Sequence, residues 1–501
     1  MKEEKKMKKL TAILAAALAG LMLFAGCSAN GGWGPYPDAN SDYFAEDVGG
    51  NYDYESVIEQ PFYETAEKSE HYFTLDRNTA NYSMVRRQIA EEMRILPDSV
   101  RAEELINYFD YDYAAPEAGD NVKSSTYLFP CPWNEEHFLM NVGVKTENVT
   151  INSIAANYVF LIDVSGSMQG DDRIGLIKKS LTTLVQSLSE KDRVAIVTYA
   201  SGVKTVLDST PADENGKQKI LNKIDGLRAG GSTNGSGGID RAYSILYENR
   251  IVNGNNRVIM MSDGDFNVGV TDGGSLSQFI SERAQEGFYL SVLGYGMGNM
   301  RDGILETLAR HGNGNYAFID NETEAKKVFE REIDGMLVTV AKDAKAGVIF
   351  NEETVKSYRP IGYDTKLISE DQFDDPDTDA GEIGSNLCVS ILYEIELTET
   401  AQAGARLADV EIRYKDADGE NADRTEKNFI NYLPNPTNDT AFISCVAEFA
   451  MILRNSAYKG DANFQSILTR LEGLSDYLAA DELKAEFKTI VLKAARSELY
   501  G

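Results

Sequence analysis

Cysteine, histidine and positive charge are scarce in this chain of 501 residues, which has four Cys, three His, and 49 Lys and Arg against 79 Asp and Glu. The net charge of −30 repels phosphate groups, which excludes nucleic acid as an expected partner. The three His are scattered, and the chain has neither a G-x-S-x-G nucleophile motif nor a G-x-x-x-x-G-K-[ST] phosphate loop. We therefore expect no enzymatic activity.

The cysteines do not form a disulfide framework. Apart from Cys27 near the start, the chain holds Cys131, Cys388 and Cys445, which is an odd number. Cys388 lies in an apolar, strand-like run and Cys445 in a helical one. We expect buried free thiols.

The amino terminus has the parts of a secretory signal. A lysine-rich head precedes the apolar run Leu10–Ala25, which is too short for a spanning helix, so residues 1–26 are interpreted as a signal peptide. The sequence Phe24-Ala-Gly-Cys27 resembles a bacterial lipobox, with Phe in place of the more usual Leu. That resemblance implies that Cys27 carries a lipid anchor at the extracytoplasmic face of the cell membrane. The alternative is an ordinary cleaved signal that leaves a free Cys.

The mature chain is long enough for about three domains. Residues 27–70 are rich in Gly, Asn, Asp, Tyr and Pro and show no sustained period, which predicts a flexible tether. Residues 71–156 form an N-terminal flanking region with two helical and two strand-like runs. Residues 436–501 are helical again.

Between the flanking regions, residues 157–337 alternate strands and helices, which predicts an α/β domain with a doubly wound parallel sheet. The apolar run Tyr158–Ile162 predicts a central strand buried on both faces, and Glu322–Leu337 a closing helix. Residues 338–435 carry further strand-like runs and predict a β-domain. Because strand-like runs also occur in 122–146, the simplest packing joins these to the β-domain, which makes the α/β domain an insertion.

Oxygen-bearing side chains gather where the strands of the α/β domain end. Asp163, Ser165 and Ser167 follow the first strand at alternate positions, Thr233 lies in a glycine-rich turn, and Asp263 follows a second buried strand. Open α/β sheets bind ligands at the carboxyl ends of their strands. Oxygen-only ligands suit a hard cation, and three hydroxyls beside two carboxylates favour Mg²⁺ or Mn²⁺ over Ca²⁺, which prefers a more acidic cage.

These five residues, in this order and element context, resemble the metal-ion-dependent adhesion site (MIDAS) of von Willebrand factor A (VWA) domains. From about residue 71 to 495 the chain also resembles a family of bacterial VWA-domain lipoproteins with conserved flanking regions. The stretches that carry this resemblance include NYFDYDY (107–113), SDGDFNVGVT (262–271) and GNGNYAFID (312–320). The resemblance implies a Rossmann-like domain whose three hydroxyls contact the cation directly, with at least one of the two carboxylates acting through water. It also implies an open coordination position that attracts an Asp or Glu carboxylate of a protein partner.

Two functions remain open from the sequence. The first is a membrane-anchored binding protein that captures an acidic protein ligand through the cation. The second is a structural or assembly factor of the cell envelope in which the metal only stabilises the fold. In animal receptors with this kind of site the closing helix shifts on ligand binding, so Glu322–Leu337 is expected to be either a moving element or a rigid joint.

Overall fold

The computed structural model describes residues 57–150, 154–232, 236–264, 273–296, 302–417 and 424–500. The α/β domain is built on a six-stranded sheet with the order β10-β9-β8-β5-β6-β7, in which β7 alone runs antiparallel to its neighbour. The strands are β5 (Ala156–Asp163), β6 (Arg193–Tyr199), β7 (Val203–Pro211), β8 (Asn255–Ser262), β9 (Phe288–Tyr295) and β10 (Tyr316–Ile319).

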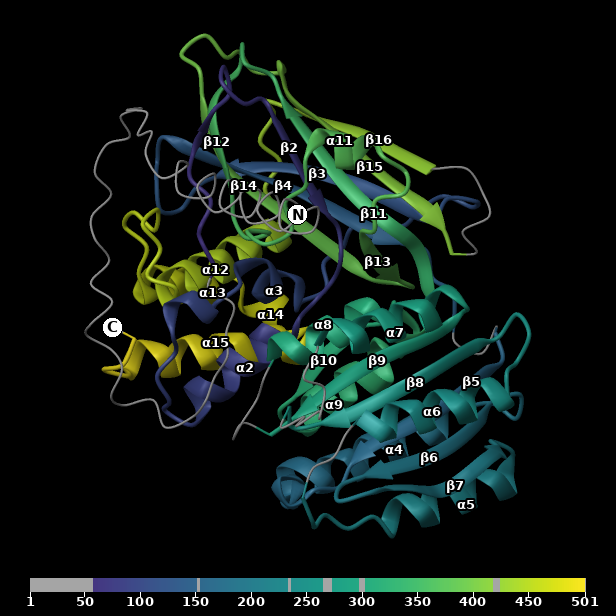
Figure 1. Cartoon of the computed structure of the whole chain (residues 1–501). Coiled ribbons are helices and arrows are strands. Elements are labelled where there is room, and N and C mark those ends of the chain that lie inside the picture. The colour runs from purple at the N-terminus through teal and green to yellow at the C-terminus, as the bar shows by residue number, and fades with distance from the viewer. Residues whose placement is uncertain are drawn as a thin grey trace, which may run out of the picture. The chain divides into compact units, whose positions relative to one another are not determined.

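Helices cover both faces of this sheet (Figure 1). They are α4 (Leu176–Ser187) and α5 (Glu214–Asp225) on one face, and α6 (Ser236–Glu248), α7 (Gly273–Gln285) and α8 (Asp302–His311) on the other. Alternate residues of β5 enter different cores: Phe160 and Ile162 pack with α4 and α5, whereas Val159 and Leu161 pack with α6. Every residue of β5 is buried, and the prediction of a doubly wound sheet around this strand is confirmed.

The β-domain is a sandwich of two antiparallel sheets with one shared core. One sheet has the order β1 (Tyr63–Glu64), β12 (Val355–Pro360), β14 (Cys388–Leu397), β4 (His137–Thr146) and β3 (Val122–Pro130). The other has the order β13 (Gly381–Gly384), β11 (Thr339–Phe350), β15 (Arg406–Asp416) and β16 (Arg424–Asn431), and β2 (Glu70–Thr74) also pairs with β11. Because β4 precedes the α/β domain and pairs with β14, which follows it, the predicted insertion is confirmed.

The folded part begins earlier in the chain than the predicted tether allows. Of residues 27–70, the structure describes 57–70, and these contribute β1 and the start of β2. Tyr63 pairs with Tyr358 of β12, and the Glu59 carboxylate accepts hydrogen bonds from Ser456 and Arg359. A segment without internal period is therefore ordered by strands and charges that lie some 300 residues away in sequence.

The N-terminal and C-terminal helices share one core. They are α2 (Ala80–Ala90), α3 (Ala102–Asn107), α12 (Asn438–Leu453), α13 (Phe464–Gly473), α14 (Ser475–Ala479) and α15 (Glu482–Arg496). Phe109 meets Phe442 edge-on with ring centroids 4.9 Å apart, and Phe487 contacts both rings. None of the helices in the described ranges is long and apolar enough to cross a membrane. Cys131, Cys388 and Cys445 are buried and free, as predicted.

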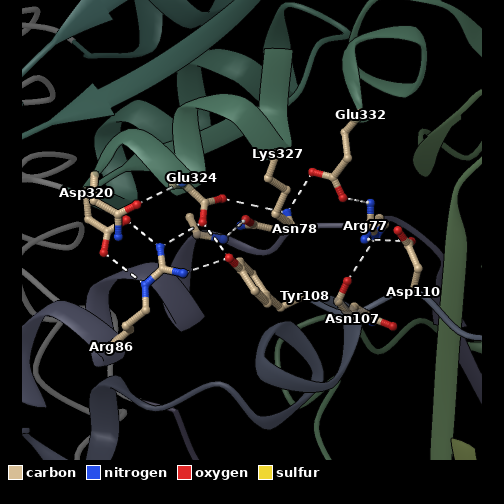
Figure 2. Close-up of polar contacts among 12 residues, drawn as sticks. Arg77, Asn78, Arg86, Asn107, Tyr108, Asp110, Asp320, Glu324, Lys327 and Glu332 are labelled. Atoms are coloured by element: carbon tan, nitrogen blue, oxygen red, sulfur yellow. Dashed lines mark hydrogen bonds and ion pairs between the residues drawn. The ribbon is translucent and has the colours of Figure 1, made fainter. Parts of the chain in front are cut away.

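The closing helix of the α/β domain is interrupted, although the sequence predicts one continuous helix over 322–337. It consists of α9 (Glu322–Lys326), a π-helical turn (Lys327–Arg331) and α10 (Ile333–Leu337). The backbone leaves helical geometry at Glu332, with φ −107° and ψ 4°. The reason lies in a buried set of charges that holds the side chains of this helix (Figure 2).

Arg86 of α2 is the centre of this charged network. Its side chain is 2% exposed and donates hydrogen bonds to Asp320 at 3.0 Å, to Glu324 of α9 at 2.8 Å and to the Tyr108 hydroxyl at 2.8 Å. The Tyr108 hydroxyl in turn donates to Glu324 at 2.7 Å. The flanking helix α2 is thereby joined to the closing helix by charges that are shielded from water.

A second group of charges holds the interruption itself. The Lys327 ammonium lies 2.7 Å from a Glu332 oxygen and 4.3 Å from the centroid of the Tyr108 ring, and Arg77 donates to the other Glu332 oxygen. Burial alone raises the pKa of Glu332, but the cations of Arg77 and Lys327 outweigh it and hold that pKa below its ordinary value. Both ends of the break are thus fixed by ion pairs, which favours a rigid joint over a moving helix.

Arg86→Leu is expected to lower the free energy of unfolding by about 3–5 kcal/mol, because it leaves the buried Asp320 carboxylate without its cation and Glu324 with Lys327 alone, 3.7 Å away. Equilibrium unfolding in urea measures this. The control is Arg331→Leu, which removes an exposed ion pair with Glu482 and is expected to cost less than about 1 kcal/mol. Equal losses in the two variants would contradict the importance of the buried network.

Candidate metal centre

The candidate centre lies at the carboxyl edge of the central strands. Asp163 is the last residue of β5, and Asp263 directly follows β8, the parallel neighbour of β5. Their side chains reach the same edge of the sheet, where Asp163 is 0% and Asp263 4% exposed. Two of the predicted site residues are thus brought together by strand order, although they are a hundred residues apart in sequence.

The segment Asp163–Met168, here called the metal loop, turns its polar groups toward one another. The Ser165 amide donates to Asp163 Oδ1 at 2.8 Å, and residues 166–168 form a single 3₁₀ turn. This turn places the Ser165 and Ser167 hydroxyl oxygens 2.9 Å apart. Three of the predicted ligands therefore lie on one short turn, as their alternate spacing suggests.

A second loop, residues 229–232, is bound directly to the metal loop. The Gly230 amide donates to the Val164 carbonyl at 2.7 Å, and the Gly166 amide donates to the Gly231 carbonyl at 2.9 Å. Gly231 adopts a φ of +99°, which L side chains rarely tolerate. Thr233, the residue that follows this loop, lies outside the described residues, as does Cys27.

Sequence reasoning missed two residues of the centre, Ser262 and Tyr199. Ser262, the last residue of β8, donates its hydroxyl to Asp163 Oδ2 at 3.4 Å and accepts the Gly264 amide at 3.2 Å. Tyr199 ends β6 on the other side of β5 and is fully buried. Its pKa lies well above the ordinary value because of burial and the negative charge of Asp163. Their position at strand ends beside Asp163 is the signal that could have identified them.

Two buried carboxylates at one edge carry an electrostatic cost. Burial raises the pKa of Asp163 to about 6, hydrogen bonds from Ser165 oppose this, and the negative charge of Asp263 adds to the increase. Within the described ranges there is no group of three or more His, Cys, Asp and Glu side chains that could hold a metal ion. A cation here would depend on hydroxyl oxygens beside few carboxylates, and this all-oxygen donor set fits a hard divalent ion.

Asp263 and the turn Asp171–Gly175 carry charges beside the centre, but the remaining described loop segments around it have no charged side chain. This holds for residues 164–170, 200–203 and 229–232, which are rich in Gly and Ser. Gly166, Gln169, Ser201 and Gly231 are exposed among them. In a chain with a net charge of −30, this neutral rim is a place that an anionic group can approach.

Three family models match the chain. The model "von Willebrand factor" matches residues 49–141, "von Willebrand factor type A domain" matches 157–331, and "Uncharacterized protein YfbK, C-terminal" matches 335–496. The type A match covers β5 to the π-helical turn of the closing helix. The other two matches lie on either side of it, in the flanking regions.

Relatives agree with these matches. Over 439 residues the chain is 34% identical to "Uncharacterized protein YfbK" of Escherichia coli (strain K12), which covers 83% of this chain and 76% of that protein. It is 27% identical over 198 residues to inter-alpha-trypsin inhibitor heavy chain H1 of Homo sapiens, over 38% of this chain and 21% of that one. The solved structure of a von Willebrand factor type A protein from Catenulispora acidiphila aligns at a TM-score of 0.40 and 15% identity, over 74% of this chain and 89% of that one. At that score the alignment adds nothing to the fold class, which rests on the strand order.

Gly231→Ala is expected to lower the free energy of unfolding by about 1–3 kcal/mol, since it forces a side chain into a left-handed conformation. The added methyl would also lie 2.7 Å from the Ser201 hydroxyl oxygen and displace the loop that binds the metal loop. The matched control is Gly202→Ala, where the new methyl meets no atom within 4 Å. Thermal unfolding of both variants measures the difference, and an unchanged Gly231→Ala would contradict the strained geometry.

Proposed function

The chain belongs to the family of YfbK and contains a von Willebrand factor type A domain, and on this premise we propose that it is a membrane-anchored, extracytoplasmic binding protein. Domains of this type typically take part in protein–protein interaction and adhesion. The proposed ligand is a protein that presents an Asp or Glu carboxylate to a divalent cation. The proposed cation ligands are Asp163, Ser165, Ser167, Thr233 and Asp263.

The observation that carries this proposal is the convergence of oxygen atoms at one strand edge. The metal loop brings two hydroxyl oxygens within 2.9 Å of each other, and two buried carboxylates lie at the same edge. The Ser165 amide orients Asp163, and the backbone bonds to residues 230–231 hold the turn in place. A bound divalent ion would supply a positive charge that two carboxylates and neutral hydroxyls neutralise only in part, with a position left for a partner's carboxylate.

The ligand set also bears on the choice of cation. Neutral hydroxyls form a compact site of low charge, whereas Ca²⁺ takes six to eight oxygens and is bound tightly by several carboxylates. We propose Mg²⁺ or Mn²⁺ at this site. The neutral rim supports an anionic partner, since the remainder of this acidic chain repels one at long range.

A second function has its own support. The buried charges between the N-terminal flanking region and the α/β domain suit an envelope structural or assembly factor in which the cation only stabilises the fold. In both functions we propose a non-enzymatic role.

Asp163→Asn separates the two functions. Its side chain keeps an acceptor for the Ser165 amide but loses the charge, so cation binding and cation-dependent partner capture are expected to disappear. The melting temperature without metal is expected not to fall, because the change removes one of two buried carboxylate charges. Titration calorimetry with Mg²⁺, Mn²⁺ and Ca²⁺, and crosslinked capture from native membranes with and without chelator, measure the two effects. Asp208→Asn, an exposed change in β7, is the control.

Partner capture that survives in Asp163→Asn, together with lower stability in metal-containing buffer, would favour the structural factor. Much tighter binding of Ca²⁺ than of Mg²⁺ by the unaltered protein would contradict the proposed cation.

Membrane anchoring is tested at Cys27. Cys27→Ala is expected to block lipidation, so that the protein accumulates unprocessed or leaves the membrane fraction, whereas Ser28→Ala has no such effect. Mass spectrometry of the mature amino terminus decides the point. An unmodified terminus downstream of Cys27 in the unaltered protein would refute the anchor.

A further inference from the structure

The flanking helix α2 reaches the turn that follows the metal loop. Arg86 holds α2 against Asp320, which directly follows β10 at the carboxyl edge of the sheet (Figure 2). The next residue, Arg87, donates from Nη2 to Asp172 Oδ2 at 3.1 Å and from Nε to Glu91 at 2.9 Å. Arg87 is 13% exposed and so gives up most of its contact with water to make these bonds.

Asp172 belongs to a π-helical turn, Asp171–Gly175, between the metal loop and α4. The next residue of this turn, Arg173, donates from Nη1 to the Ser167 carbonyl at 2.8 Å. Its Nε lies 4.0 Å from Asp172 Oδ2, so this carboxylate is placed between the guanidinium groups of Arg87 and Arg173. A Cβ added at Gly296 would meet the Arg173 side chain, which shows how closely that side chain is held against the loop after β9.

These contacts form a continuous path from outside the α/β domain to a proposed cation ligand. It runs from Arg87 to Asp172, from Asp172 to Arg173, and from Arg173 to the backbone of Ser167. The Ser167 hydroxyl lies 2.9 Å from that of Ser165, so a shift of the Ser167 backbone would separate two proposed ligands. A metal site requires its ligands to be held within about half an ångström of their binding geometry by surrounding contacts.

We propose that Arg87, Asp172 and Arg173 are positioning residues of the metal loop, so that the N-terminal flanking region sets part of the cation affinity. This inference rests on the proposed function. The cation affinity of the α/β domain then depends on a residue outside it, because Asp172 accepts a hydrogen bond from Arg87 of α2, which lies 85 residues earlier in the chain.

The direction of the effect distinguishes positioning from simple charge. If Arg87 acted only through its field, Arg87→Gln would remove a positive charge near the site and strengthen cation binding. Positioning predicts the opposite for Arg87, a binding constant for Mn²⁺ weakened about threefold in Arg87→Gln. Asp172→Asn is expected to weaken it about tenfold, but loss of a negative charge acts in the same direction, so the Arg87 variant is the one that separates the two explanations. Because both act along one path, the double variant is expected to bind no more weakly than Asp172→Asn alone.

The experiment is titration calorimetry of the full chain with Mn²⁺ and with Mg²⁺ alone, beside thermal unfolding in the absence of metal. The control is Arg331→Gln, which breaks another ion pair between the α/β domain and a flanking helix but lies outside the path. The expected result is weaker binding in Arg87→Gln and Asp172→Asn with unchanged melting temperatures, unchanged binding in Arg331→Gln, and recovery in Arg87→Lys.

The outcomes separate the two proposals. Unaltered protein that binds Mn²⁺, with equal or tighter binding in Arg87→Gln, would overturn the positioning role and leave the proposed function intact. Unaltered protein that binds neither cation would overturn both. Additive losses in the double variant would show separate effects of the two residues and overturn the single path.

Discussion

The pairing of β4 with β14 closes the chain around the inserted α/β domain. Val142 lies opposite Ile391 in the middle of one sandwich sheet, and both are buried in its core. The chain leaves this sheet after Thr146, returns to it at β12, and begins β14 after Leu387, whose amide donates to the Thr146 hydroxyl at 2.9 Å. Because β11 directly follows the closing helix and lies in the opposite sheet, both connections of the α/β domain end in the same sandwich.

Buried ion pairs join the N-terminal flanking region to the closing helix of the α/β domain. A chain with an excess of acidic groups places Arg77, Arg86 and Lys327 in its interior. Arg77 and Arg86 face carboxylates from another segment, whereas Lys327 faces Glu332 of its own helix. Such pairs contribute little net stability over apolar contacts, but one partner without the other is strongly unfavourable. Arg77 and Arg86 reach Glu332 and Glu324 from the N-terminal flanking region, and the interruption at Glu332 lies among these pairs.

The candidate metal centre combines contacts within one short loop with contacts from distant segments of the chain. The metal loop is shaped by its own amides and hydroxyls, whereas residues 230–231, Ser262 and Tyr199 enclose it from three other segments of the domain. A rigid sheet edge that carries short polar loops places ligands more accurately than a flexible surface can. In the proposed function, this accuracy would let an acidic chain hold a cation and still accept an acidic partner.

Much of the fold follows from local pattern. The apolar run of β5 and the alternation of strands and helices predict the doubly wound sheet, because a strand buried on both faces needs apolar residues at every position. The spacing of Asp163, Ser165 and Ser167 predicts one turn with three converging oxygens, since alternate residues of a tight loop share a side.

Only the tertiary structure determines which residues from distant parts of the chain contact one another. The break at Glu332 depends on Arg77, 255 residues earlier, and the order of residues 57–70 depends on strands near residue 358. The proximity of Ser262 to Asp163, and the contact of Arg87 with Asp172, arise only when separate elements meet. Local periodicity determines which face of an element is apolar, but the identity of a charged partner depends on the path of the chain between the two residues, and no local pattern contains it.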